Sequence, residues 1–466
     1  MDRPNILLMY TDQQRWDALG ANGNADVRTP NLDALAAEGA CFGRFFVQCP
    51  VCMPSRMSML TGRYPAGVGV TSNGPPLPAD AVTLPRLLRN YGYLSANIGK
   101  LHFLPHANRD HREIHPAYGF DHLEISDEPG CYEDAYRAWV RRKAPDQLDL
   151  VSAGLPPATK VWQETVGVRD GIAHPAERFP KRPVAFRGRS DLTHSAFVAE
   201  QTMAFVRARS REGRPWLCIA GFYSPHSPWV APREFIDLYD RDKLAVPSFP
   251  EELQQERIER GFDDEQLRGA RQGYYAMVSE VDHHVGRILR CLDETGQAGR
   301  TIVLFTSDHG EWLGEHLRWG KGYPGYDGSA RVPLVVRWAP GGAADGRSID
   351  DLTEAVDVVP TLLNWCGAPV PYELQGQPLP IADADPPARD SALIEGTGYV
   401  SLRTDDFLYV LRGREQEHLY DLTQPHGEYR DVSAEPARAA ALSDHRGRLA
   451  RRLLTRQRPL RPTWPY

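Results

Sequence analysis

The chain has 466 residues, of which 41% are hydrophobic and 25% charged, a composition typical of a folded globular protein and not of a disordered one. Its formal net charge of -7 excludes the positive field expected of a protein that binds nucleic acid or an anionic membrane, so we expect a small-molecule partner. The apolar run at residues 6–10 is too short for a signal-peptide core or a membrane span, which predicts a cytoplasmic protein.

Two residue types have unusual counts. Lysines are rare, because only six of the 54 Lys and Arg residues are lysines, and a lysine within a motif is therefore informative. The seven cysteines are an odd number, which disfavours a disulfide framework or a structural zinc site and predicts reduced thiols.

The order of apolar runs and helical patterns predicts an α/β fold with a large, mostly parallel sheet covered by helices on both faces. Strands are expected at residues 5–10, 94–98, 216–222 and 301–306, and helices at 32–38, 191–209, 272–292 and 357–366. Residues 106–189 have no regular pattern and predict a long insertion on the face where the loops gather.

A change of pattern after residue 367 predicts a second, smaller unit. Residues 1–367 are expected to form the catalytic domain, and the Pro- and Gly-rich residues 368–387 a linker. Residues 388–466 predict an α+β subdomain with short antiparallel strands at 392–395, 399–403, 407–411 and 418–420, a helix at 436–455 and a Pro-containing tail. That tail could pack on a neighbouring copy in a homo-oligomer.

Polar side chains follow each of the four predicted strands directly. Ligands of open α/β sheets bind at the carboxyl ends of the strands, so these side chains are candidates for one common site. They are Asp12 and Gln13 after the first strand, Lys100 and His102 after the second, His226 after the third, and Asp308 and His309 after the fourth.

The first and fourth strand ends together offer two carboxylates, an amide oxygen and an imidazole. This mainly oxygen set suits a hard divalent cation such as Ca²⁺, Mg²⁺ or Mn²⁺. The alternative is a metal-free pair of carboxylates that act as acid and base, as in glycosidases. The neighbouring amide and imidazole favour the metal.

The most specific local signal is Cys52-Met53-Pro54-Ser55-Arg56, followed by Thr61-Gly62-Arg63. Pro54 in a first helical turn places Cys52 at a helix N-terminus, where free N–H groups stabilise an anion. The pattern C-x-P-S-R with T-G-R is the one read by the formylglycine-generating machinery of the sulfatase family, and the chain resembles that family over almost its whole length.

The resemblance implies an alkaline phosphatase-like fold and a sulfuric ester hydrolase in which Cys52 is oxidised to formylglycine by a formylglycine-generating enzyme. One hydroxyl of the hydrated aldehyde attacks sulfur and expels the alcohol. The second hydroxyl then loses its proton, and collapse to the aldehyde releases sulfate. The substrate implied is a small anionic ester.

The resemblance also implies roles for individual residues. One divalent cation, with Ca²⁺ favoured over Mn²⁺ or Mg²⁺, is expected on Asp12, Gln13, Cys52, Asp308 and His309. Arg56 resembles the residue that activates the nucleophile, Lys100 and Lys321 the lysines that hold sulfate oxygens, His102 the base and His226 the general acid. Asn73 either contacts substrate or shapes a turn.

Two positions depart from the commonest family pattern, since many members have Asp where Gln13 stands and Asn where His309 stands. The Gln and His pair resembles the branch of choline sulfatases and phosphonate monoester hydrolases. A phosphonate monoester or phosphodiester hydrolase is therefore the alternative activity, while Lys100 and His102 favour sulfate. A silent binding protein with an unoxidised Cys52 and a two-metal phosphatase fit the sequence less well.

Overall fold

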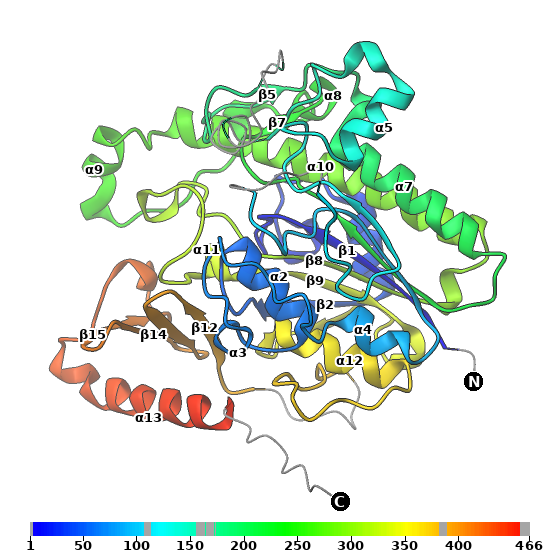
Figure 1. Ribbon diagram of the computed structural model, residues 1–466. Helices are drawn as coiled ribbons and strands as arrows, with labels where there is room; N and C mark the ends of the chain where they lie inside the picture. Colours follow the sequence, from blue (N-terminus) through cyan, green and yellow to red (C-terminus); the bar gives the residue numbers. More distant parts are fainter. Residues whose placement is uncertain are drawn as a thin grey trace, which may run out of the picture.

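The computed structural model describes residues 3–106, 113–154, 164, 172, 174–381 and 389–456. A nine-stranded, mostly parallel sheet runs through the centre of the molecule, with helices on both faces, as predicted (Figure 1). Its order is β10 (Arg347–Ile349), β2 (Ala40–Phe46), β9 (Arg331–Arg337), β8 (Thr301–Ser307), β1 (Asn5–Thr11), β6 (Trp216–Gly221), β3 (Leu94–Gly99) and β4 (His122–Ile125), and β11 (Thr353–Glu354) also pairs with β2.

The middle of the sheet is parallel and buried on both faces. Strand β1 pairs in parallel with β6 and β8, and β3 pairs in parallel with β6 and β4. Every residue of β1, β6 and β8 is buried, which explains their continuous apolar sequences. Strand β9 runs antiparallel to both β8 and β2, so the sheet is mixed at that side.

Two helical layers enclose the sheet (Figure 1). The helices of the first layer contribute to one apolar core, and those of the second layer to the core on the opposite face. The first layer contains α1 (Pro30–Glu38), α5 (Ala135–Lys143), α7 (His194–Arg209) and α10 (Asp264–Glu294), and the second contains α2 (Cys52–Thr61), α4 (Leu84–Arg89) and α12 (Val358–Trp365). Short helices α3 (Pro65–Val68), α8 (Arg233–Ile236), α9 (Gln254–Glu259) and α11 (Asp327–Ala330) lie in the connections, where β5 (Val184–Ala185) pairs with β7 (Val230–Ala231).

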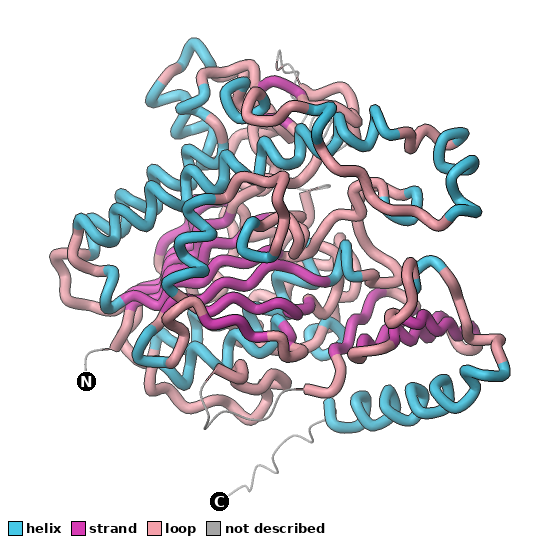
Figure 2. The backbone as a smooth tube through the Cα atoms, turned by 180° about the vertical axis from the view of Figure 1, so that it is seen from behind, coloured by secondary structure: helices cyan, strands magenta, loops and turns pink. Residues whose placement is uncertain are grey.

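The C-terminal residues form the expected four-stranded antiparallel sheet followed by a helix, seen beside the large sheet in Figure 2. The strands are β12 (Ala392–Gly396), β13 (Tyr399–Arg403), β14 (Phe407–Arg412) and β15 (Gln416–Asp421), and the helix is α13 (Ala439–Arg456). A shared apolar cluster includes Leu393 and Leu402 of the small sheet together with Tyr64 and Val356 of the large unit. Residues 457–466, which include most of the expected oligomerisation arm, lie outside the described residues.

Several local expectations need adjustment. The insertion is more regular than the sequence indicated, because it contains the edge strand β4 and the helix α5, whose N-cap Asp134 accepts a hydrogen bond from the backbone of Arg137. The described part of the expected linker, residues 368–381, buries Leu374 and Ile381 in the main core.

Among the described residues, no helix is both long and apolar enough to cross a bilayer.

Candidate active site

The polar residues that follow the central strands lie together, as the parallel topology requires. Strands β8, β1, β6 and β3 are successive neighbours, and they run in the same direction. Their carboxyl ends therefore bring Asp308, Asp12, His226 and Lys100 to one edge of the sheet. All four residues are buried.

Cys52, the first residue of helix α2, lies at the same site as these strand ends. The helix begins after the extended Val51 and ends at Gly62, whose φ of 64° is a left-handed conformation that glycine adopts readily. Every residue of α2 is buried, so the helix is fixed along its whole length. The side-chain oxygen of Asn73 accepts a hydrogen bond of 3.0 Å from the backbone N–H of Met53. This contact shapes the backbone at the start of α2, and a contact of Asn73 with substrate stays a prediction.

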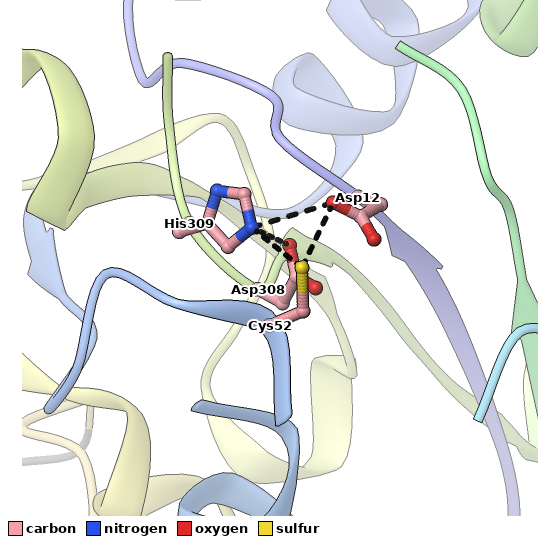
Figure 3. Close-up of side chains that lie close together, drawn as sticks. All are labelled: Asp12, Cys52, Asp308 and His309. Carbon is pink, nitrogen blue, oxygen red and sulfur yellow. Dashed lines mark hydrogen bonds and ion pairs between the residues drawn. The ribbon is translucent and has the colours of Figure 1, made fainter. Parts of the chain in front are cut away.

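Four side chains converge on one point (Figure 3). Asp12, Cys52, Asp308 and His309 each present a possible ligand atom, and these atoms lie within 4.8 Å of one another. His309 Nε2 is 3.2 Å from Cys52 Sγ and 3.3 Å from Asp12 Oδ1. Its other ring nitrogen, Nδ1, is 2.8 Å from the carbonyl oxygen of Gly310, which as an acceptor places the proton on Nδ1. Burial lowers the pKa of His309, but Asp308, Cys52 and Asp12 together outweigh it and raise that pKa to about 9.

Gln13 completes this set with an amide. Its backbone is left-handed, with φ of 71°, and its N–H donates to Asp308 Oδ1 at 3.1 Å. The side-chain nitrogen donates to the carboxylate of Glu311, so the side-chain oxygen faces the cluster, where it accepts from Lys321 at 3.3 Å. Gln13 is among the residues expected here from the sequence, whereas Glu311 is not.

Lys321 places its ammonium group against this cluster. The nitrogen is 2.7 Å from Cys52 Sγ, 3.0 Å from His309 Nε2 and 3.3 Å from Gln13 Oε1. Burial and Asp12 raise the pKa of the Cys52 thiol, but Lys321 and His309 act in the opposite direction, and the net pKa is lowered. The position of residue 52 therefore favours a negatively charged group.

Two further cationic side chains contact the carboxylates of Asp308 and Asp12. Arg56 Nε donates to Asp308 Oδ2 at 2.7 Å, and Lys100 Nζ lies 2.7 Å from Asp12 Oδ2. Burial raises the pKa of Asp12, but Lys100, His226 and Lys321 together hold it well below its usual range. Both Arg56 and Lys100 are 1% exposed, which excludes the ordinary interpretation of solvated surface charges.

The two predicted acid–base histidines are also buried here. His226 Nδ1 donates to the carbonyl oxygen of Ser227 at 2.6 Å, so Nε2 faces Lys321 Nζ at 3.2 Å. The backbone N–H of His102 donates to Asp127 Oδ1 at 2.9 Å. The His102 ring stacks on the ring of His106, with 3.9 Å between the ring centroids. Burial lowers the pKa values of His102 and His226, and the neighbouring cations lower them further.

His316, in the loop that follows β8, has a different environment. Its ring stacks between Tyr326 and Tyr429, at 3.9 and 4.1 Å between ring centroids, and its Nε2 is 3.5 Å from a carboxylate oxygen of Glu428. These contacts connect the loop that carries Lys321 to the C-terminal unit. His316 is thus part of the support of the site.

The comparisons with known proteins agree with this geometry. The sulfatase family matches residues 4–368. An arylsulfatase of Clostridium perfringens is 30% identical over 90% of this chain and 88% of its own, and the choline-sulfatase of Rhizobium meliloti is 31% identical over 78% of this chain and 68% of its own. The crystal structure of a phosphonate monoester hydrolase of Agrobacterium radiobacter, 28% identical, superimposes with a TM-score of 0.77 over 97% of this chain and 96% of that one. The chain belongs to the sulfatase family, within the alkaline phosphatase superfamily.

Proposed function

We propose that this protein hydrolyses sulfate monoesters and that residue 52 acts as a formylglycine. The observation that carries the proposal is the position of Cys52, at the N-terminus of a buried helix and in contact with both His309 and Lys321. A structural cysteine needs neither a cationic neighbour nor a cluster of ligand atoms around its sulfur.

The donor set fits a divalent cation. Asp12, Asp308 and His309 would hold it together with the oxygen of Gln13 and a side-chain oxygen of the oxidised residue 52. Two of these donor atoms, Gln13 Oε1 and His309 Nε2, already contact the cationic ammonium group of Lys321, which supports a cluster that attracts positive charge. The mainly oxygen set favours Ca²⁺, while the imidazole and the amide also permit Mn²⁺. When bound, the cation would supply Lewis-acid stabilisation of negative charge.

The oxidised residue 52 would supply a geminal diol, in which one hydroxyl is the nucleophile and the other allows sulfate to be released. Other side chains of this protein would carry out the remaining steps. Lys100 and Lys321 flank Cys52 and Asp12, so they are placed to hold the ester oxygens as negative charge accumulates. Lys100 is buried and Lys321 is partly buried, and contacts with Asp12 and with Cys52 hold the two ammonium groups at the site.

His226 and His102 are the proposed proton carriers. His226 keeps a proton on Nδ1, so Nε2 is the nitrogen that would take a second proton and give it to the leaving oxygen. His102, with its lowered pKa, is neutral and is suited to accept the proton of the second hydroxyl. The ester that binds must displace the Lys321 ammonium from His226 Nε2, which would let that nitrogen be protonated.

A second activity, hydrolysis of phosphonate monoesters, is favoured by one observation. The Gln13 and His309 pair occurs at the metal cluster in place of the Asp and Asn of many sulfatases, and a phosphonate monoester hydrolase is among the similar structures. The buried Lys100 and His102 favour the sulfate ester, because phosphonate monoester hydrolases have less charged residues at the corresponding positions.

The test compares kcat/KM for an aryl sulfate and for a phenylphosphonate monoester with the same leaving phenol. The protein should contain oxidised residue 52 and be loaded with Ca²⁺ or Mn²⁺, and the Cys52→Ala variant serves as the inactive control. We expect the sulfate ester to be the better substrate. Higher kcat/KM for the phosphonate would assign the second activity, and equal rates for the wild type and Cys52→Ala would refute both.

A further inference from the structure

Glu311 is a buried carboxylate without a role in the reaction proposed above. It follows strand β8 by four residues, is 0% exposed, and has no ion pair among the residues that the structure describes. Its carboxylate is instead held by N–H donors. Such a group needs an explanation, because an ionisable side chain is seldom buried without a charged partner.

The donors of Glu311 come from two different segments of the active site. Oε1 accepts from the backbone N–H groups of Leu313, at 3.1 Å, and Gly320, the residue before Lys321. Oε2 accepts from the side-chain nitrogen of Gln13. One carboxylate therefore connects the loop that ends in Lys321 with the amide at the cation cluster.

This connection fixes the orientation of the Gln13 amide. A primary amide can present either its oxygen or its NH₂ group, and only the oxygen can serve a cation. Because a carboxylate accepts hydrogen bonds only, Glu311 selects the NH₂ group of Gln13 and leaves the oxygen on the opposite side. That oxygen is the atom that accepts from Lys321 Nζ at 3.3 Å.

We propose that Glu311 is a positioning residue that directs the Gln13 oxygen toward the cation cluster and holds the Lys321 loop beside it. The same contact explains why an amide occupies position 13. A carboxylate there would face the carboxylate of Glu311, and the two groups would repel each other or share a proton. Positions 13 and 311 therefore form a matched donor–acceptor pair.

The inference rests on the proposed function, because it assumes that the cluster binds a divalent cation.

Glu311→Gln reverses the local hydrogen-bond pattern. The new side chain can still accept from the backbone N–H groups of Leu313 and Gly320, but its NH₂ group then faces the NH₂ group of Gln13. Gln13 must turn over and present its NH₂ group to the cluster. Gln13→Glu places two carboxylates face to face. The exchange of both residues, Gln13→Glu with Glu311→Gln, restores one donor and one acceptor.

The experiment measures binding of Mn²⁺ and Ca²⁺ to these three variants and to the wild type by titration calorimetry at pH 8, without substrate. Each single substitution should weaken binding about 10- to 100-fold, as loss of a group that orients a metal ligand does. The double exchange should recover most of that loss. Glu280→Gln, which alters another buried carboxyl group in helix α10, is the matched control and should leave cation affinity unchanged.

The outcomes separate the two proposals. If the wild type binds neither cation, the metal of the proposed function is wrong. If the wild type binds but the double exchange binds no better than Gln13→Glu alone, the role of Glu311 is wrong while the metal stands. This comparison decides the matter even if Glu311→Gln by itself does not fold.

Discussion

The ammonium nitrogen of Lys321 lies 2.7 Å from the sulfur of Cys52, and the same nitrogen lies 3.2 Å from Nε2 of His226. A single cation thus bridges the proposed nucleophile position and the proposed general acid. An ester bound between them would meet this charge on the sulfate oxygens. Replacing Lys321 alone therefore tests its effect on the reaction separately from the effects of Arg56 and Lys100.

Lys321→Met keeps most of the side-chain volume but removes the charge and the N–H donors. We expect kcat/KM for an aryl sulfate to fall by about 10²- to 10³-fold, the loss typical of removing a fixed donor to developing charge. Lys243→Met is the matched control, because the Lys243 side chain is 83% exposed. Similar rates for the two variants would exclude Lys321 from the reaction.

Maturation at Cys52 has an internal control three residues away. Cys49 is also buried, but its thiol has no lysine contact among the described residues, and burial together with Glu395 raises its pKa. Mass analysis of the peptide that contains both residues should show an aldehyde at Cys52 and an intact thiol at Cys49. A peptide with both thiols intact after expression in the native host would refute the formylglycine mechanism.

His226→Ala should affect poor leaving groups much more than good ones. An alkyl alkoxide needs a proton as it departs, whereas an activated phenolate does not. We therefore expect kcat/KM to fall steeply for an alkyl sulfate and little for a nitrophenyl sulfate. Equal losses on both esters would remove His226 from the role of general acid.

Removal of the cation should reduce both activity and stability. A ligand that binds only the folded state stabilises it by about 2.7 kcal/mol when its concentration is 100 times the Kd. Dialysis against a chelator should therefore lower the Tm, and Ca²⁺ or Mn²⁺ should restore it. This shift should shrink in Asp12→Asn, which removes a ligand carboxylate, and persist in Asp242→Asn, whose side chain is 79% exposed in the wild type. Full activity after complete removal of metal would contradict the metal proposal.

Much of the site could be predicted because its residues follow strand ends directly. Asp12, Lys100, His226 and Asp308 come within five residues of the end of a buried parallel strand, and the topology of such strands brings their carboxyl ends together. Cys52 stands out by the C-x-P-S-R and T-G-R pattern that resembles the sulfatase family. These signals are short-range, so one sequence contains them completely.

The missed features depend on tertiary structure. The role of Glu311 requires the left-handed Gln13 and a loop that returns at Gly320, and no local pattern specifies that closure. Strand β9 lies outside the predicted strands, and Pro333 within Arg331–Arg337 is a residue that is usually unfavourable within a sheet. Within the insertion, the edge strand β4 has only a weak sequence signal because it is four residues long and partly exposed.

His194 predicts a pH dependence of stability that is independent of catalysis. This residue begins helix α7, is 5% exposed, and has its Nε2 3.2 Å from the carbonyl oxygen of Ser126. Burial lowers the pKa of His194 to about 3, whereas an unfolded histidine has a pKa of about 6.5. Between these values the unfolded state binds the proton and the folded state does not. The contribution of His194 is therefore lost as the pH falls from 6.5 toward 3, by up to about 1.4 kcal/mol per pH unit.

Other buried carboxyl groups act in the opposite direction, Glu280 and Asp134 among them. Burial raises the pKa values of Glu280 and Asp134 to about 7, so their contributions are lost as the pH rises toward 7. The His194 effect must therefore be measured as a difference. His194→Gln keeps a donor for Ser126 but cannot be protonated, and both carboxyl groups remain in the variant. Urea titrations from pH 4.5 to 8 should show a free energy of unfolding that decreases more steeply toward acid in the wild type than in His194→Gln. Parallel curves would mean that His194 is protonated equally in the folded and unfolded states, contrary to its burial.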